Sequence, residues 1–308
     1  NGDYSLNQAS IANSDLLQLG NGSSFDLSGT FSQIGLGLVQ MGTTITTVGS
    51  NISFNRPVTL TQGSSLSTGG TVGTISFAAT MDGGYGLVLN AGNVTFSDIV
   101  GGGISLTSLN VTASGLINVA ANQTVSLGPM SYIGDVVLTT ASTTTQFIDG
   151  GASGITFQPS SSPAIAGNGG DCNLTLLANN SSISVLGTVN LSGSGTTNGG
   201  DLMATCSGNM SFTGEILTQG GGAGVNGGHG GNVSLNATGG TISIQNINTS
   251  GGSGSGTGGN AGNILLQPAS GYSAGYPIGL IIVNADLSSG GDGNLVAVGG
   301  VGGSGGVI

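Results

Sequence analysis

Alternating apolar and polar positions recur along nearly the whole chain and predict short β-strands. Typical runs are Ile52-Ser53-Phe54, Val58-Thr59-Leu60 and Ile183-Ser184-Val185, separated by segments rich in Gly, Ser and Asn. A period of two places every second side chain on one buried face, which is the pattern of a strand rather than a helix. The runs are only a few residues long, as strands are. We therefore expect an all-β protein.

One sequence unit is repeated in four copies between residues 169 and 290. Each copy opens on Gly or Ala, then Gly and an Asx residue, and the Asx positions recur at a nearly constant interval, at Asp171, Asp201, Asn232 and Asn263. Up to three alternating apolar runs follow each opening. Three strands with Gly-rich corners cannot bury a face alone, so each copy must stack on the next. The unit predicts a β-solenoid with the four Asx residues at its corners, and Asp171 about 4.8 Å from Asp201 on the adjacent rung.

A second recurring element, aliphatic–Ser/Thr–Phe, predicts stacked aromatic rings in the core. The Phe residues that end its copies all have the same parity, so we expect them to point inward as one ladder. They are Phe54, Phe77, Phe96, Phe157 and Phe212. The first three follow one another at shorter intervals than the Asx positions do, which indicates smaller rungs than those of the later tract. Rungs of about 20–31 residues follow from the two repeats.

The organisation we expect is one continuous structural unit with three parts. Residues 1–50 would form an irregular N-terminal cap, because terminal repeats of a solenoid are commonly atypical. Residues 51–168 would form a small-rung solenoid, and 169–308 a large-rung, Gly-rich solenoid with a C-terminal tail.

Composition narrows the class of protein and the partners. Only 4% of the 308 residues are charged, but 37% are hydrophobic and these alternate, which argues against disorder. Net charge is −11 and Arg56 is the single cation, which excludes nucleic acid and anionic membrane surfaces as partners. No apolar run approaches the ~20 residues of a membrane-spanning helix. We interpret the chain as a mature exported protein or a segment excised from one.

The residue pattern of several stretches resembles that of a known family. They are Ser50–Thr61, Gly73–Phe77, Gly84–Phe96 and Leu106–Thr112, together with the repeats of the type Gly-Gly-x-Gly-Gly-Asn-Val-Ser-Leu-x-Ala at 227–237 and 258–264. These stretches are similar to the filamentous-haemagglutinin-like exoproteins of bacterial surfaces. The resemblance covers about residues 50 to 300 and implies a right-handed parallel β-helix outside the cell, with an adhesive or fibre-forming role. The chain lacks that family's secretion motif at its start.

Candidate chemistry is sparse, and no cofactor is expected. The acids are scattered, and Asp171 with Asp201 is the nearest approach to a pair, for which we favour Asx turns over a catalytic or cation site. The Gly-rich turn at 290–295 resembles a Ca²⁺-binding nonapeptide, but it occurs once, and such sites need tandem copies. Asp171, Asp201 and Asp292 are therefore only weak metal candidates.

Four further residues receive ordinary structural interpretations. His229, between glycines, is expected to be a solvated loop side chain rather than a base or ligand. Arg56 is expected to be a solvated charge, with pairing to Asp82 as the alternative. Cys172 and Cys206 lie on the apolar parity and out of register with each other, so we expect two buried, free thiols.

These observations favour a non-catalytic extracellular structural protein, either an adhesive stalk or a fibre subunit. The expected partner is a second copy, joined head to tail through the apolar tail, with host or matrix glycans as further candidates. Two alternatives remain: a polysaccharide-degrading enzyme with clustered acids, and a carbohydrate-binding module with a row of exposed aromatics. The tail residues are Val298, Val301, Val307 and Ile308, and the aromatics available for a row are Tyr85, Tyr132, Tyr272 and Tyr276.

Overall fold

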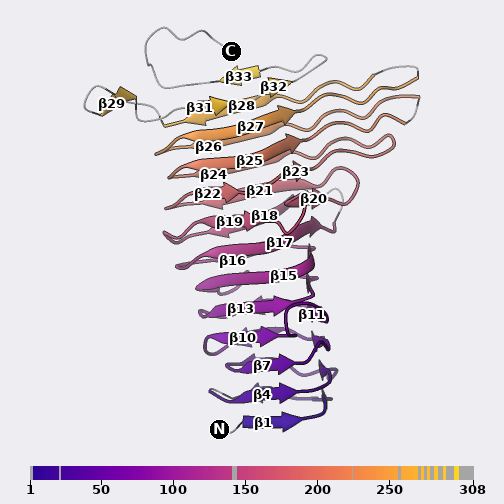
Figure 1. Ribbon diagram of the computed structural model, residues 1–308, viewed down its shortest axis with the longest axis vertical. Coiled ribbons are helices and arrows are strands. Elements are labelled where there is room, and N and C mark those ends of the chain that lie inside the picture. Colours follow the sequence, from indigo (N-terminus) through magenta and orange to yellow (C-terminus); the bar gives the residue numbers. More distant parts are fainter. Residues whose placement is uncertain are drawn as a thin grey trace.

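The computed structural model is a parallel β-helix in which every regular element of the described residues is a strand. It describes residues 3–20, 22–140, 144–223, 225–255 and 258–269, and the backbone of short strand segments between 272 and 297. Each rung contributes strands to three faces, and each strand pairs in parallel with its counterparts on the rungs above and below (Figure 1). Among the described residues no helix long and apolar enough to span a membrane is found.

The strands of the three faces are as follows. The first face comprises β1 (Asp3–Leu6), β4 (Ser24–Leu27), β7 (Thr44–Thr47), β10 (Ser64–Ser67), β13 (Gly86–Ala91), β19 (Ile155–Gln158), β22 (Ile183–Val185) and β31 (Ile281–Val283). The second comprises β2 (Ala9–Ile11), β5 (Phe31–Gln33), β8 (Ile52–Phe54), β11 (Thr74–Phe77), β14 (Asn93–Phe96), β20 (Ile165–Gly167), β23 (Val189–Asn190) and β32 (Leu287–Ser288). Four longer strands run from the first face onto the second: β15 (Ser108–Val119), β17 (Met130–Leu138), β25 (Met210–Leu217) and β27 (Ile242–Asn248).

The third face closes each rung. It comprises β3 (Leu17–Leu19), β6 (Val39–Met41), β9 (Val58–Leu60), β12 (Met81–Asp82), β16 (Gln123–Val125), β18 (Thr144–Asp149), β21 (Asn173–Ala178), β24 (Leu202–Cys206), β26 (Val233–Ala237), β28 (Ile264–Pro268) and β33 (Leu295–Ala297). Bridges of Val100 to Met81 and to Gln123 join its two halves. A short antiparallel pair, β29 (Tyr272–Ser273) with β30 (Tyr276–Pro277), lies outside the faces.

Strand register follows one continuous column through the first face. Its successive members are Tyr4, Phe25, Ile45, Leu66, Leu89, Val111, Tyr132, Phe157, Val185, Phe212, Ile244 and Val283. The described residues between 3 and 50 belong to this regular stack, so they do not form the irregular cap that the sequence predicts. Up to Phe157, fewer residues separate successive members of the column than between Phe157 and Ile244. The later rungs are therefore longer.

The five Phe residues of the predicted ladder are all buried, at 0–2% exposure, but they lie in two columns rather than one. Phe54, Phe77 and Phe96 occupy the second face, where successive rings stack 5.5 and 5.7 Å apart. Phe157 and Phe212 occupy the first face, on either side of Val185. The tripeptide fixes which way a side chain points, but both faces offer an inward position, so it does not fix the face.

The predicted burial of both cysteines is confirmed, although their register differs from the one expected. Cys206 lies opposite Ala178, whereas Cys172 precedes the start of β21 at Asn173, at the other end of that strand. The length of the strand, roughly 20 Å at ~3.3 Å per residue, separates the two thiols, so they cannot meet. Burial raises the pKa of the Cys206 thiol.

The Gly-rich segments, interpreted from the sequence as corners, instead form a projecting flange. We use this name for the described residues of 191–201, 218–232 and 249–263, which run out from the core and back in successive rungs (Figure 1). Thr218 and Gly221 are buried, as are Thr249 and Gly252, with more exposed residues between them. In each arm two buried positions thus lie three residues apart.

Backbone hydrogen bonds hold the flange together in more than one direction. The Gly221 amide donates to the carbonyl of Thr197 on the rung below, and the Gly221 carbonyl accepts from the amide of Gly228 on its own rung. On the next rung the Gly259 amide donates to the Gly252 carbonyl in the same way. The chains pack so closely that a Cβ on Gly252 would lie 1.9 Å from the carbonyl oxygen of Gly221. Only glycine fits such positions, which explains the composition of the tract.

We predict that Phe77→Ala lowers the free energy of unfolding by about 3–5 kcal/mol, because a stacked, fully buried ring is lost. Urea denaturation followed by circular dichroism measures this loss. Tyr85→Ala is the control, because Tyr85 is 44% exposed and its truncation should change stability little. Equal stability of the wild type and Phe77→Ala would contradict the assigned packing.

We predict opposite effects for two alanine substitutions in one arm of the flange. Gly252→Ala forces a methyl group onto a carbonyl and should destabilise the fold by about 1–3 kcal/mol. A Cβ on Gly258 meets only an ordinary contact of 3.7 Å, so Gly258→Ala should be neutral or stabilising by up to about 1 kcal/mol. Thermal melting of the two variants tests the packing, which is wrong if they melt alike.

Candidate functional site

A ladder of Asx side chains runs up the corner that precedes the third face. The Asn173 side-chain oxygen accepts the Asp201 amide at 2.7 Å, and Asp201 Oδ1 accepts the Asn232 amide at 2.6 Å. The Asn232 side-chain oxygen then accepts the amide of Asn263 at 2.9 Å. Each side chain therefore satisfies a backbone donor of the following rung. The corner position agrees with the sequence, but the bonds run between rungs and are not the local Asx turns that the sequence predicts.

Asp171 does not belong to this ladder, and its predicted stacking on Asp201 is wrong. Leu174 pairs with Leu202, so Asn173 rather than Asp171 lies against Asp201. The chain takes up the two extra residues in a kink before β21, where Asp171 has a φ of 51° and Gly169 and Gly170 also have positive φ. The shift is even, so the inward and outward parity is unchanged.

A second polar ladder follows the base of the flange. The Asn198 side-chain oxygen accepts the His229 amide at 2.8 Å, and His229 Nδ1 accepts the Asn260 amide at 2.9 Å. His229 is exposed, as predicted, but it is fixed by these two contacts rather than being a free loop side chain. It occupies the position that asparagine occupies on the rung below.

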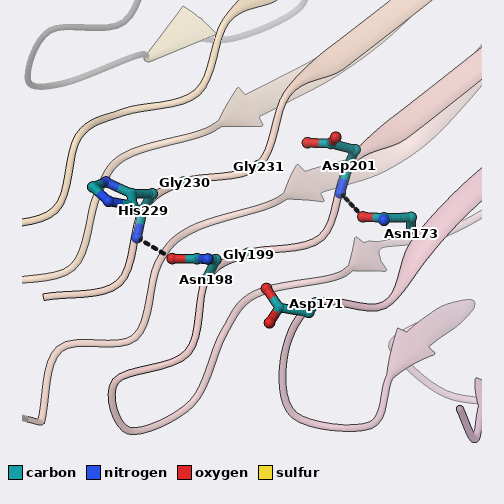
Figure 2. Close-up of a pocket in the computed structure, with 8 residues that line it drawn as sticks. All are labelled: Asp171, Asn173, Asn198, Gly199, Asp201, His229, Gly230 and Gly231. Atoms are coloured by element: carbon teal, nitrogen blue, oxygen red, sulfur yellow. Dashed lines mark hydrogen bonds between the residues drawn. The ribbon is translucent and has the colours of Figure 1, made fainter. Parts of the chain in front are cut away.

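The two ladders border a shallow groove of about 430 Å³. Asp171, Asn173 and Asp201 lie toward the third face, Asn198 and His229 toward the flange, and Gly199 and Gly230 between them (Figure 2). The backbone amide of Asp171 donates to the carbonyl of Asn198, which fixes Asp171 beside the second ladder. The groove is thus polar, spans three rungs and contains two carboxylates.

The sequence contained a signal for this arrangement that the spacing argument missed. Asn173 directly precedes a run of alternating apolar residues, as Asp201, Asn232 and Asn263 do. Asp171 precedes only Cys172, at the end of the kink. Asn198 and His229 are different residue types, so only the strand register shows that they hold equivalent positions on adjacent rungs.

The side chains that could hold a metal ion are considered for the described part of the chain. No three His, Cys, Asp or Glu side chains converge there as a metal-binding group. Asp201 Oδ1 is engaged by both the amide and the side-chain nitrogen of Asn232. Asp292, the third weak metal candidate, lies outside the described residues.

Two other acids have structural partners. Asp149 is fully buried, and its carboxylate accepts hydrogen bonds from the amides of Gly151 and Gly154 and from the Ser181 hydroxyl. Asp82 accepts the amides of Gly103 and Ile104 on the following rung. These carboxylates hold turns between rungs, and neither belongs to the groove.

The row of exposed aromatics needed for a stacking platform is incomplete. Tyr85 is 44% exposed, but Tyr132 is fully buried, stacked 5.1 Å from Phe157 with Phe147 packed edge-on against both. Tyr132 therefore cannot contact a ligand. Nothing is described of the Tyr272 and Tyr276 side chains, nor of Val298, Val301, Val307 and Ile308.

Comparison with protein-family models, curated proteins and solved structures finds no match to this chain. The fold and the groove are therefore described from this chain alone, and the family resemblance remains an expectation.

We predict that Tyr132→Phe raises the free energy of unfolding by about 1–3 kcal/mol, because the Tyr132 hydroxyl is buried without a hydrogen-bond partner. Burial raises the pKa of Tyr132 well above its ordinary value of about 10. The unfolded chain ionises first, so the wild type loses stability as pH rises above about 10, and the variant should lose less. Urea denaturation at neutral and alkaline pH measures both effects, and a destabilised variant would contradict them.

Proposed function

We propose that the chain is a non-catalytic structural protein of the bacterial cell exterior, an adhesive stalk or a self-associating fibre subunit. The observation that carries this proposal is the single apolar core that runs without interruption through the stacked rungs. The described strands stack in twelve rungs, which at ~4.8 Å each make a rod of roughly 55 Å. A rod of this kind suits a protein that spans distance or repeats along a fibre.

The surface of the rod supports a structural role over an enzymatic one. A polysaccharide-degrading enzyme needs two carboxylates poised on either side of a bond, or a cation opposite developing charge. Asp149 and Asp82 are committed to turns, and Arg56 lies between β8 and β9, many rungs from the groove. The resemblance to filamentous-haemagglutinin-like exoproteins is the reason for proposing an extracellular location.

Self-association is proposed to occur through the open strand edges and the apolar side chains near them. On the first rungs Tyr4, Leu6 and Leu16 are 46–49% exposed, beside a hollow of about 380 Å³ lined partly by Ile11 and Phe25. Unpaired strand edges are templates for further strands. A head-to-tail contact is heterologous and propagates unless the rotation closes.

We predict that the purified chain forms unbranched filaments whose amount changes little with ionic strength, since so few residues are charged. Analytical ultracentrifugation and negative-stain microscopy measure this at low and high salt. The double variant Tyr4→Ser, Leu6→Ser should remain dispersed rods, and Val225→Ser, an equally apolar but distant surface change, should assemble normally. A wild type that stays monomeric at high concentration in both salts would remove the fibre role and leave the stalk.

A further inference from the structure

The groove between the two polar ladders presents polar atoms that the fold does not use. Within the described residues the Asp171 carboxylate has no side-chain hydrogen bond, and Asp201 engages its neighbour only through Oδ1. Asn173 and Asn198 use their side-chain oxygens as acceptors, which leaves both NH₂ groups available. These atoms come from consecutive rungs and line one hollow (Figure 2).

His229 adds a donor whose identity follows from its ladder contact. Nδ1 accepts the amide of Asn260, so it carries no proton, and the neutral ring bears its proton on Nε2. The imidazole therefore offers an N–H group on the flange side of the groove. Donors on Asn173, Asn198 and His229 thus alternate with carboxylate acceptors on Asp171 and Asp201.

Close backbone packing at the floor of the groove leaves no room for side chains there. A Cβ on Gly199 would lie 2.0 Å from the carbonyl oxygen of Thr218, and one on Gly230 would lie 1.9 Å from that of Thr249. No side chain can replace these glycines without moving backbone. The hollow therefore stays open across three rungs, a span of roughly 10 Å at ~4.8 Å per rung, which suits an elongated ligand.

The charge of the groove limits the class of ligand. Two carboxylates and no cation line it, which repels phosphate, sulfate and uronate groups. A hydroxyl group can donate to a carboxylate and accept from an amide or imidazole N–H, so it pairs with every polar atom present. The repeat along the rungs matches a ligand that itself repeats hydroxyl groups.

We propose that this groove binds a neutral oligosaccharide, with Asp171 and Asp201 accepting from its hydroxyls and Asn173, Asn198 and His229 Nε2 donating to them. The inference refines the adhesive role under the proposed function by assigning it a site and a ligand class. Without an aromatic platform the affinity rests on hydrogen bonds to an open surface. Binding should therefore be weak for one chain and strengthen where many copies are arrayed.

Titration calorimetry with cellohexaose, mannohexaose and N-acetylated chitohexaose tests the proposal on the full chain. At least one of these hexamers should bind, and hexagalacturonate should not. Asp171→Asn removes one acceptor charge and is compatible with the positive φ, because asparagine tolerates that conformation. His229→Asp keeps a side-chain oxygen that can accept the Asn260 amide but carries no donor in place of Nε2. Each should weaken binding about tenfold or more, because a charge-assisted or an imidazole hydrogen bond is lost.

Glu215→Gln is the matched control, since it also converts an exposed acid to its amide but lies on β25 outside the groove. It should bind like the wild type. No binding of the three neutral hexamers, equal binding by all variants, or binding of a chitosan hexamer alone would overturn the proposal. A response to CaCl₂ alone that Asp171→Asn abolishes, without any saccharide binding, would assign the carboxylates to a cation instead. Rod shape and filament formation of the same variants are independent of these outcomes, so failure here leaves the structural role standing.

Discussion

The parallel backbone ladder between rungs is the constraint on which the rest of this structure depends. Each strand pairs with its counterparts above and below, so a side chain within a paired strand stands over the side chain one rung away. An apolar residue then buries itself against another apolar residue, and a polar corner residue meets the amide that it can accept. Columns of Phe, columns of aliphatic residues and the two polar ladders are all consequences of that one alignment.

Much of the fold can be predicted from the sequence, because the alternation within a single strand shows which of its side chains point inward. Alternation at Ile52-Ser53-Phe54 or Ile183-Ser184-Val185 identifies a strand and its inward side chains without knowledge of any partner. Register between rungs is not local, since it depends on how many residues each corner absorbs. That is why the inward orientation of Phe157 could be predicted but not its face. For the same reason the repeat spacing places Asp171 where the structure has Asn173.

The candidate groove depends on register still more strongly. Asn198 and His229 have different side chains and lie in different glycine contexts, so only strand pairing shows that both accept an amide from the next rung. The flange was hidden for a related reason. Glycine predicts turns when it is considered singly, whereas here it permits extended chains to approach to backbone contact.

The flange also changes how this molecule can grow. A conventional insertion must either bring hydrophobic residues to form a new core or remain an unstructured loop. The described residues of the arms at 218–232 and 249–263 do neither, because hydrogen bonds between main chains hold them, with further bonds from the Thr218 and Thr249 hydroxyls. A rung can therefore become wider while its hydrophobic interior keeps the same cross-section. The width of a rung in this solenoid can thus change independently of its hydrophobic core. Surface area can be added at one corner by a segment that consists of little more than glycine.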